Sequence, residues 1–330
     1  MKLLAVDLGY SSVKIAYYNE EGVLQFDKYI SSVAKLDTKP EQTDDDVVFR
    51  LGTDYYILGP SALKVSRNAL LNLENFEDMK VAYPVWISYL LKKYGKFDKV
   101  IIGLSMAFTE RANELLKYLY DTLMIQEENY FICLPQGLSC KVGYKEFGND
   151  LREVSTKNDQ RLRNYLIVDG GFLTLDVSQV VNGTASAGST IGVPDTGVIF
   201  IARKVMEYLF KEYQMRISSF EAKTIIDNGG EFTRRGRVLN IGDKIIEFTK
   251  EYIKEVLEFL EKNFGDSIDS IEGILVCGGL AYFFKRLIDD PDVIQEIEKH
   301  FPISFLHFPK DDCEYYNCVS YLKIAEQKLK

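Results

Sequence analysis

Apolar residues alternate with polar or small ones in two distant segments of the chain, and a glycine turn interrupts each alternation. Leu3–Tyr17 reads LLAVDLGYSSVKIAY, and Tyr165–Gln179 reads YLIVDGGFLTLDVSQ. Such alternation around a glycine predicts a strand, a tight turn and a second strand. The two segments align without a gap, so we predict that each half of the chain opens with the same β-hairpin.

Two further features recur in the same order after each hairpin. A later strand with glycine at or near its end is expected at Lys99–Leu104 and at Gly273–Leu280. Each half then closes with a turn and a helix-like stretch, at Leu134–Cys140 and at Tyr315–Ala325. Features repeated in the same order indicate an internal duplication. We therefore expect an α/β protein with two related lobes.

The segments between these features predict two insertions. Residues 30–70 look mixed and strand-like, with a solvated acidic run at Asp44–Asp46 and a turn at Gly52. Residues 200–265 look mostly helical, with a glycine-marked turn before the last helix. Three-to-four spacing predicts that this helix buries one face, made of Ile245, Phe248, Tyr252, Val256, Phe259 and Leu260.

Lobe boundaries follow from the duplication. We expect lobe I over residues 1–150 together with about 310–330, and lobe II over residues 151–310. The polar segment Gly148–Asn164 would be a surface loop or the connection between the lobes. A length of 330 residues agrees with two domains.

Composition narrows the possible partners and the compartment. The net charge of −9 argues against extensive direct contact with nucleic acid, although an adaptor protein could still link the chain to DNA. Five cysteines without a C-x-x-C pair and two histidines make a zinc site or a disulfide framework unexpected; buried cysteines in a reducing cytosol fit better. No apolar run is long enough to span a membrane and no signal peptide is recognisable, so we expect a cytoplasmic protein without a membrane partner.

The two hairpin turns carry residues suited to holding phosphates. Glycine lets backbone N–H groups approach a phosphate closely, hydroxyls add donors, and a lysine supplies a positive charge. The candidates are Gly9, Ser11, Ser12 and Lys14 in the first hairpin, and Gly170, Gly171 and Thr174 in the second. Turns of this kind on both lobes would clamp a polyphosphate between them.

Asp7 and Asp169 stand at matching places, each at the end of the first strand of its hairpin. Phosphates would repel these carboxylates unless a cation intervened, and Mg²⁺ prefers a few carboxylates with waters and phosphate oxygens. Both residues are therefore candidate metal ligands. Asp176 aligns with Lys14 and faces the same side as Thr174. The alternative is that each aspartate caps its turn.

Val276–Leu280, reading VCGGL, ends a strand and opens a helix. Gly278 and Gly279 would permit close approach of a nucleotide ring or ribose, although a plain strand-to-helix turn looks the same. The cluster Arg234–Arg237 could contact adenine or phosphate, or could form a solvated loop.

Five of these segments together resemble the set that defines the actin, heat-shock chaperone and sugar-kinase superfamily. They are its first phosphate motif, first connecting helix, second phosphate motif, adenosine motif and second connecting helix, at Leu3–Tyr17, Leu134–Tyr144, Leu166–Val180, Ile274–Phe284 and Tyr315–Ala325. Within the superfamily, Thr174–Val180, reading TLDVSQV, is similar to the ParM-like plasmid-segregation actins, and Gly188–Gly197 fits the same pattern. Two residues depart from the superfamily's motifs: Cys277 in the adenosine motif and Ser320 in the second connecting helix stand where glycine is common.

The resemblance implies an actin-like, ribonuclease H-like duplicated fold with inserted subdomains and a nucleotide cleft between the lobes. It implies ATP or ADP with Mg²⁺, slow ATP hydrolysis, and filaments that move plasmid or other DNA through an adaptor. Carried over by position, Asp7 and Asp169 would organise the metal, and Gln136 would orient the attacking water. An amide is a poor base, so hydrolysis should be slow.

Three rival functions remain on the same superfold. A sugar- or acetate-type kinase would need a carboxylate base over a substrate pocket, and Leu104–Arg111 offers no recognisable one. A membrane-linked division actin would need a stronger terminal amphipathic helix than Tyr321–Lys330. A filament without hydrolysis would not need Asp7, Asp169 and Gln136 together.

Overall fold

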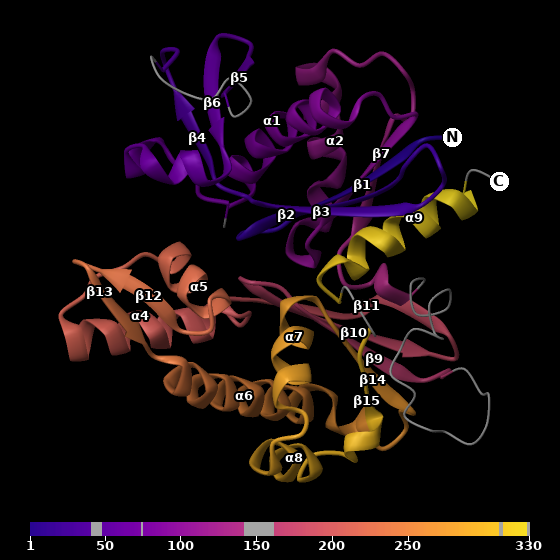
Figure 1. Ribbon diagram of the computed structural model, residues 1–330. Coiled ribbons are helices and arrows are strands. Elements are labelled where there is room, and N and C mark those ends of the chain that lie inside the picture. Colours follow the sequence, from indigo (N-terminus) through magenta and orange to yellow (C-terminus); the bar gives the residue numbers. More distant parts are fainter. Residues whose placement is uncertain (41–47, 74, 142–161, 310–312, 329–330) are drawn as a thin grey trace. The chain divides into compact units, whose positions relative to one another are not determined.

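The computed structural model describes residues 1–40, 48–73, 75–141, 162–309 and 313–328 (Figure 1). The chain divides into two compact units, one of Met1–Glu146 with Tyr315–Lys330 and the other of Phe147–Glu314. The acidic run Asp44–Asp46 and most of Gly148–Asn164 lie outside the described residues.

The first unit is built on a five-stranded sheet in the order β3-β2-β1-β7-β8. Its strands are β1 (Leu3–Leu8), β2 (Ser12–Tyr18), β3 (Leu24–Ile30), β7 (Lys99–Leu104) and β8 (Phe131–Pro135). The first three are antiparallel, whereas β7 runs parallel to both β1 and β8. The predicted hairpin is therefore present at the start of the chain.

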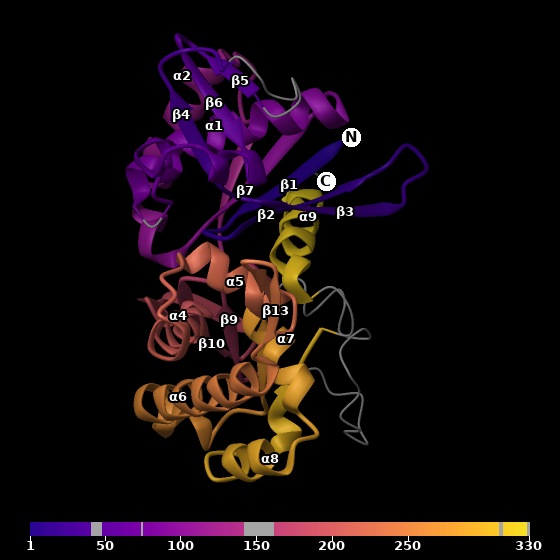
Figure 2. The same ribbon diagram turned by 60° about the vertical axis from the view of Figure 1, so that its left-hand side comes forward.

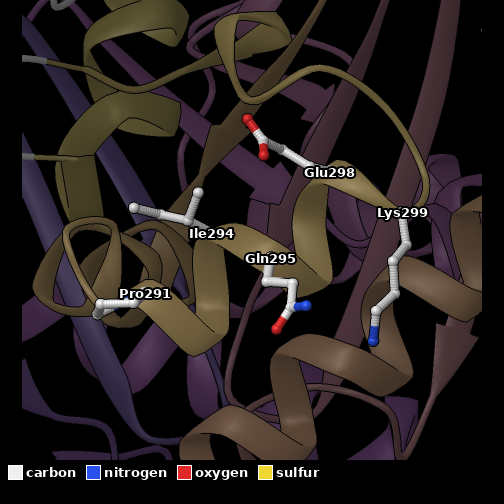
Figure 3. Close-up of a pocket in the computed structure, with 5 residues that line it drawn as sticks. All are labelled: Pro291, Ile294, Gln295, Glu298 and Lys299. Carbon is white, nitrogen blue, oxygen red and sulfur yellow. The ribbon is translucent and has the colours of Figure 1, made fainter.

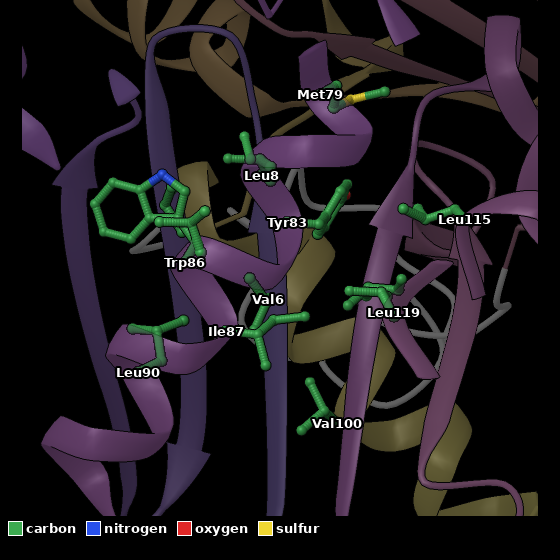
Figure 4. Packing of buried hydrophobic residues seen from close by; sticks show 14 of the residues in the cluster. Val6, Leu8, Met79, Tyr83, Trp86, Ile87, Leu90, Val100, Leu115 and Leu119 are labelled. Atoms are coloured by element: carbon green, nitrogen blue, oxygen red, sulfur yellow. The ribbon is translucent and has the colours of Figure 1, made fainter. Parts of the chain in front are cut away.

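Alternation along β1 separates two hydrophobic cores. Leu4, Val6 and Leu8 pack in one cluster with α1 (Phe76–Tyr94) and α2 (Ala112–Leu123). Leu3 and Ala5 belong to a second cluster with α9 (Tyr316–Lys328). Successive side chains of a strand point to opposite faces, so helices cover both sides of this sheet. Figure 4 shows the first cluster, in which large side chains of α1 cover β1 and β7.

A smaller three-stranded sheet occupies the first predicted insertion, in the order β4-β6-β5. Its strands are β4 (Val33–Leu36), β5 (Val48–Leu51) and β6 (Asp54–Leu58), with the expected turn at Gly52 in a left-handed conformation, φ 61°. Strand β5 packs on α1, beside which the sheet lies in both views (Figures 1 and 2). Three short 3-10 helices complete this unit before α2: η1 (Gly59–Lys64), η2 (Arg67–Ala69) and η3 (Met106–Arg111).

The second unit repeats the plan of the first with the strand order β11-β10-β9-β14-β15. The strands are β9 (Tyr165–Gly170), β10 (Thr174–Val181), β11 (Thr184–Pro194), β14 (Gly273–Cys277) and β15 (Leu306–His307). As in the first unit, a three-stranded antiparallel meander is followed by two parallel strands. This correspondence confirms the duplicated α/β fold expected from the paired hairpins.

Helices complete the second unit: α4 (Ile199–Tyr213), α5 (Ser219–Asp227), α6 (Gly242–Ile268), α7 (Gly278–Leu287) and α8 (Pro291–Glu298), with η5 (Ile303–Phe305). The one-turn η6 (Cys313–Tyr315) leads into α9. Helix α7 packs on β9 and β14, and α8 lies along α6 in both views (Figures 1 and 2). The periodic face predicted for α6 is buried, except that Phe259 is only half-buried.

The second insertion is not purely helical. Between α5 and α6 the chain forms a two-stranded hairpin, β12 (Glu231–Arg234) and β13 (Arg237–Asn240). Each strand has only four residues, and the charged segment between them resembled a plain loop, so alternation gave too weak a signal. The glycine-marked turn is present, since Gly229, Gly230 and Gly236 all have positive φ, but the prediction did not include the hairpin.

Two other expectations can be compared with the described residues. None of their helices is long and apolar enough to cross a membrane. Cys140, Cys277 and Cys318 are buried and unbridged, and Cys133 is half-buried with a thiol whose pKa burial raises to about 12.

Candidate functional site

The two predicted phosphate turns have the same backbone geometry. In the first, the Gly9 N–H donates to the Ser12 carbonyl at 3.0 Å; in the second, the Gly171 N–H donates to the Thr174 carbonyl at 2.9 Å. A Cβ on Gly9 would lie 3.2 Å from the Ser12 carbonyl oxygen, which is closer than most real Cβ contacts. Glycine therefore permits the first turn to close.

The strand register places a charged residue opposite each of the two aspartates. Asp7 pairs with Lys14 across β1 and β2, and the Lys14 Nζ lies 4.0 Å from the Asp7 Oδ2. Asp169 pairs with Asp176 across β9 and β10, and the Thr174 hydroxyl donates to the Asp176 Oδ2 at 3.4 Å. All three aspartates are buried. The first hairpin thus carries an acid and a base at these positions, and the second carries two acids.

Gln136 reaches Asp7 from the end of β8. Its Nε2 donates to the Asp7 Oδ1 at 2.5 Å, across 129 residues of sequence. Its backbone N–H donates to the Leu104 carbonyl at 2.9 Å, which ties the residue to the neighbouring strand β7. The structure therefore brings three predicted site residues together in the first unit: Asp7, Lys14 and Gln136.

The glycines of the VCGGL segment pack against the second hairpin. Gly278 has φ +70°, and a Cβ there would lie 2.4 Å from the Asp169 Oδ1. A Cβ on Gly170 would lie 2.2 Å from the Cβ of Leu280. These two glycines are thus required by the protein's own packing, while Gly279 makes only ordinary contacts. Asp169 and the start of α7 accordingly pack directly against each other within the second unit.

The start of α4 is hydrogen-bonded to the turn of the second hairpin. The Val198 N–H donates to the Gly171 carbonyl at 3.0 Å, and the Ile199 N–H donates to the Phe172 carbonyl at 2.7 Å. Gly197 donates to Leu173 at 3.1 Å and has no room for a side chain, since a Cβ would lie 2.5 Å from the Phe172 carbonyl oxygen. The residues from Gly197 onward thus hold the turn of the second hairpin in place through backbone hydrogen bonds.

The surroundings of Asp7 include buried groups that sequence reasoning did not assign. Tyr83 donates to the Gly103 carbonyl, and Cys318 donates to the Lys14 carbonyl at 3.3 Å. Burial, followed by the charge of Asp7, raises the pKa of the Cys318 thiol well above its ordinary value. The pKa of Tyr321 is raised for the same two reasons. These groups therefore stay neutral beneath the carboxylate.

Asn317 is a further residue that the sequence did not single out as functional. It is buried on α9, and its Oδ1 accepts from the Gly137 N–H at 3.1 Å and from the Cys140 thiol at 3.2 Å. The available signal was its place in the last motif, but its partners are 180 and 177 residues away in sequence.

Two other features lie apart from these contacts. Arg234 and Arg237 pair at the tip of the β12–β13 hairpin, and Arg235 and Arg237 are exposed, which fits the solvated-loop interpretation. A hollow on α8 is lined by Pro291, Ile294, Gln295, Glu298 and Lys299 (Figure 3). None of the predicted site residues lines it, so the hollow gives no support to a nucleotide site there.

The chemistry of the aspartates fits a magnesium ion with few protein ligands. Among the described residues no group of three or more histidines, cysteines and acids could enclose a metal ion. Magnesium does not need such a group, because it keeps waters and takes phosphate oxygens. Asp7 beside the Gly9 turn, and Asp169 beside Gly171, supply carboxylates of the required kind.

Comparison with known proteins agrees with this architecture. Residues 160–319 match the family model described as plasmid segregation protein ParM, C-terminal. A search of curated protein sequences found no match to this chain.

Solved structures share the fold over the whole chain. An archaeal actin homologue, Ta0583, superposes with a TM-score of 0.70 at 16% identity, covering 99% of this chain and 100% of the other. The ParM of a 15-stranded filament from Clostridium botulinum gives 0.67 at 16% identity, with 99% of each chain covered. Bacillus thuringiensis ParM with ATP gives 0.63 at 15%, again with 99% of each chain covered. The actin-like fold expected from the five segments is therefore confirmed.

Proposed function

We propose that this chain, an actin-like protein that is similar to ParM over its second half, binds ATP with Mg²⁺, hydrolyses it slowly and forms nucleotide-dependent filaments. The contact between Gln136 and Asp7 carries the proposal, because it joins a residue suited to orienting water to one suited to organising a metal. The comparisons support the same reading, since relatives of this fold were solved with ATP and ADP.

Phosphate binding would use both hairpin turns. The backbone of the Gly9 and Gly171 turns, the hydroxyls of Ser11, Ser12 and Thr174, and the Lys14 ammonium supply donors of the kind that phosphate oxygens accept. Gly279 would serve the nucleoside, because glycine leaves room for a ring or a ribose, whereas the space beside Gly278 is taken by the Asp169 carboxylate.

Asp7 and Asp169 would hold the magnesium ion through its water shell. The ion would neutralise charge on the phosphates and thereby favour attack at the terminal one. Burial of both carboxylates keeps bulk water from competing for them.

Gln136 would orient the attacking water in the first unit. A neutral amide can align a water molecule through its hydrogen bonds, but it removes a proton poorly. Slow turnover is the expected consequence. Hydrolysis would therefore set how long a filament persists.

Polymerisation is proposed because the ParM of Clostridium botulinum, which shares this fold, was solved as a filament. A head-to-tail contact that does not close on itself extends without limit. Binding of the terminal phosphate would favour the polymerising conformation, and its loss would weaken the contact. Such filaments would move plasmid or other DNA in the cytoplasm through a separate adaptor protein, since the net charge of −9 does not suit direct DNA binding.

The test is light scattering and sedimentation of the purified protein with Mg²⁺ and ATP, ADP or a non-hydrolysable ATP analogue, followed by negative-stain microscopy. Filaments are expected with ATP and the analogue, and their loss with ADP. Asp169→Ala should abolish Mg²⁺-dependent hydrolysis while circular dichroism stays unchanged. A protein that stays monomeric at high micromolar concentration with ATP and instead phosphorylates a small metabolite would be a kinase.

A further inference from the structure

Asn317 connects the last helix of the chain to the residue next to Gln136. Its Oδ1 accepts two hydrogen bonds, from the Gly137 N–H at 3.1 Å and from the Cys140 thiol at 3.2 Å. The side chain is only 7% exposed. A buried amide oxygen that accepts from a backbone N–H is costly to remove, because the donor left behind stays buried without a partner.

These hydrogen bonds act on a turn that is otherwise held by local contacts, such as the hydrogen bond from the Leu138 N–H to the Gln136 carbonyl at 2.6 Å. Gly137 adopts φ +66°, so the chain leaves β8 in a left-handed conformation immediately after Gln136. On the other side, the Gln136 N–H is held by the Leu104 carbonyl at 2.9 Å. Gln136 is thus fixed by β7 through its own amide and by α9 through the amide of the next residue.

The helix that carries Asn317 is itself positioned against the same strands. Cys318 donates to the carbonyl of Lys14, the register partner of Asp7. One turn later, Tyr321 lies against Gly103, where a Cβ would come within 2.1 Å of the tyrosine hydroxyl. Helix α9 therefore sets Asn317 in a fixed relation to both Asp7 and the end of β7.

From this geometry we propose that Asn317 is a positioning residue that holds the turn after β8 so that the Gln136 amide stays on Asp7. The inference rests on the proposed role of Gln136 in hydrolysis. The hydrogen bonds of Asn317 are made to Gly137 and Cys140, so we assign it no direct contact with the nucleotide or the water. It acts on the rate through Gln136, and it has no effect on how tightly ATP is bound.

The decisive comparison is between Asn317→Leu, Gln136→Ala and the double variant. Leucine has the same branching at Cγ as asparagine but offers no acceptor, so the Gly137 N–H loses its partner. We expect kcat for ATP hydrolysis to fall roughly tenfold in each single variant with KM within about twofold, the pattern of a residue that acts in the transition state. The double variant should be no slower than Gln136→Ala, because residues that act through one group are not additive.

A matched control is Ser320→Ala on the same helix. Ser320 is fully buried, but its hydroxyl donates to the Tyr316 carbonyl within α9 and does not contact the turn. This variant removes a buried side-chain hydrogen bond from the same helix and should keep the wild-type kcat. If Asn317→Leu does not fold, Asn317→Ser keeps a polar group in the site while falling short of Gly137, and the same kcat loss is expected.

Three results would overturn the inference. A double variant whose losses multiply would show that Asn317 acts independently of Gln136. An Asn317→Leu protein with wild-type kcat, alongside a slow Gln136→Ala protein, would refute positioning while leaving the proposed function intact. If Gln136→Ala itself hydrolysed ATP at the normal rate, the proposed role of Gln136 would fall first, and the inference with it.

Discussion

Lys14 and Asp176 occupy the same position in two equivalent hairpins, and they carry opposite charges. Lys14 is the register partner of Asp7, and Asp176 is the register partner of Asp169. Directly opposed residues of an antiparallel pair lie on the same face of the sheet. The duplicated backbone therefore presents a cation beside the first aspartate and a second anion beside the other, so the two hairpins differ in charge although their turns match.

Replacing the lysine should weaken nucleotide binding. Lys14→Met keeps the length of the side chain and removes its charge, so we expect the ATP dissociation constant to rise roughly tenfold, in line with the loss of one charge-assisted hydrogen bond. Isothermal titration calorimetry measures this. The matched control is Lys28→Met, because exposed Lys28 is the neighbour of Lys14 on β3. Equal losses in both variants would mean that only the overall charge matters.

Gly278 should be intolerant of any side chain. Its φ of +70° and the 2.4 Å approach to Asp169 Oδ1 predict that Gly278→Ala lowers the free energy of unfolding by about 2–4 kcal/mol. Gly22 has φ +76° with open space around it, so Gly22→Ala should cost only about 1 kcal/mol. Urea denaturation followed by circular dichroism compares the two. Similar losses of unfolding free energy in the two variants would show that the positive φ, and not the contact with Asp169, determines the cost.

The contact between Gly103 and Tyr321 predicts a specific coupling. Gly103→Ala should destabilise the protein by about 1–3 kcal/mol, because the new methyl group meets the tyrosine ring. Tyr321→Leu frees that space, so the double variant should be more stable than the sum of the single losses predicts. A double-mutant cycle by denaturant unfolding measures the interaction, expected at about 0.5–3 kcal/mol. Additive losses would contradict the contact.

His307 should make stability depend on pH. Burial lowers the pKa of this imidazole below 6.5 in the folded chain. Below pH 6.5 the unfolded state therefore binds more protons than the folded state, so stability falls as pH falls towards the folded pKa and is restored above 6.5. His307→Gln should show a smaller drop in thermal midpoint between pH 7 and pH 5 than the wild type. An unchanged drop would assign the acid sensitivity to other groups.

Local signals sufficed for the two hairpins on which most of the candidate site residues lie. Alternation with glycine at the turn identified both hairpins, and the gapless alignment of Asp7 with Asp169 identified the duplication. Gln136 was found through the resemblance of its segment to a known motif, and the structure places it on Asp7.

Contacts between distant parts of the chain could not be foreseen in the same way. The sequence marks Gly278 as a glycine but does not reveal that Asp169 lies where its Cβ would be. The two hydrogen bonds of Asn317 depend on how α9 docks, which no local pattern encodes. The β12–β13 hairpin was missed because four-residue strands give almost no periodic signal.

Helix α9 has a consequence for the order in which the chain can fold during synthesis. It supplies part of the core beneath Leu3 and Ala5, although more than 300 residues separate them from the helix. The first unit thus leaves the ribosome with one face of its sheet still bare, whereas the second unit is contiguous and is complete before α9 emerges. The last segment to be synthesised therefore completes the hydrophobic core of the unit that is synthesised first.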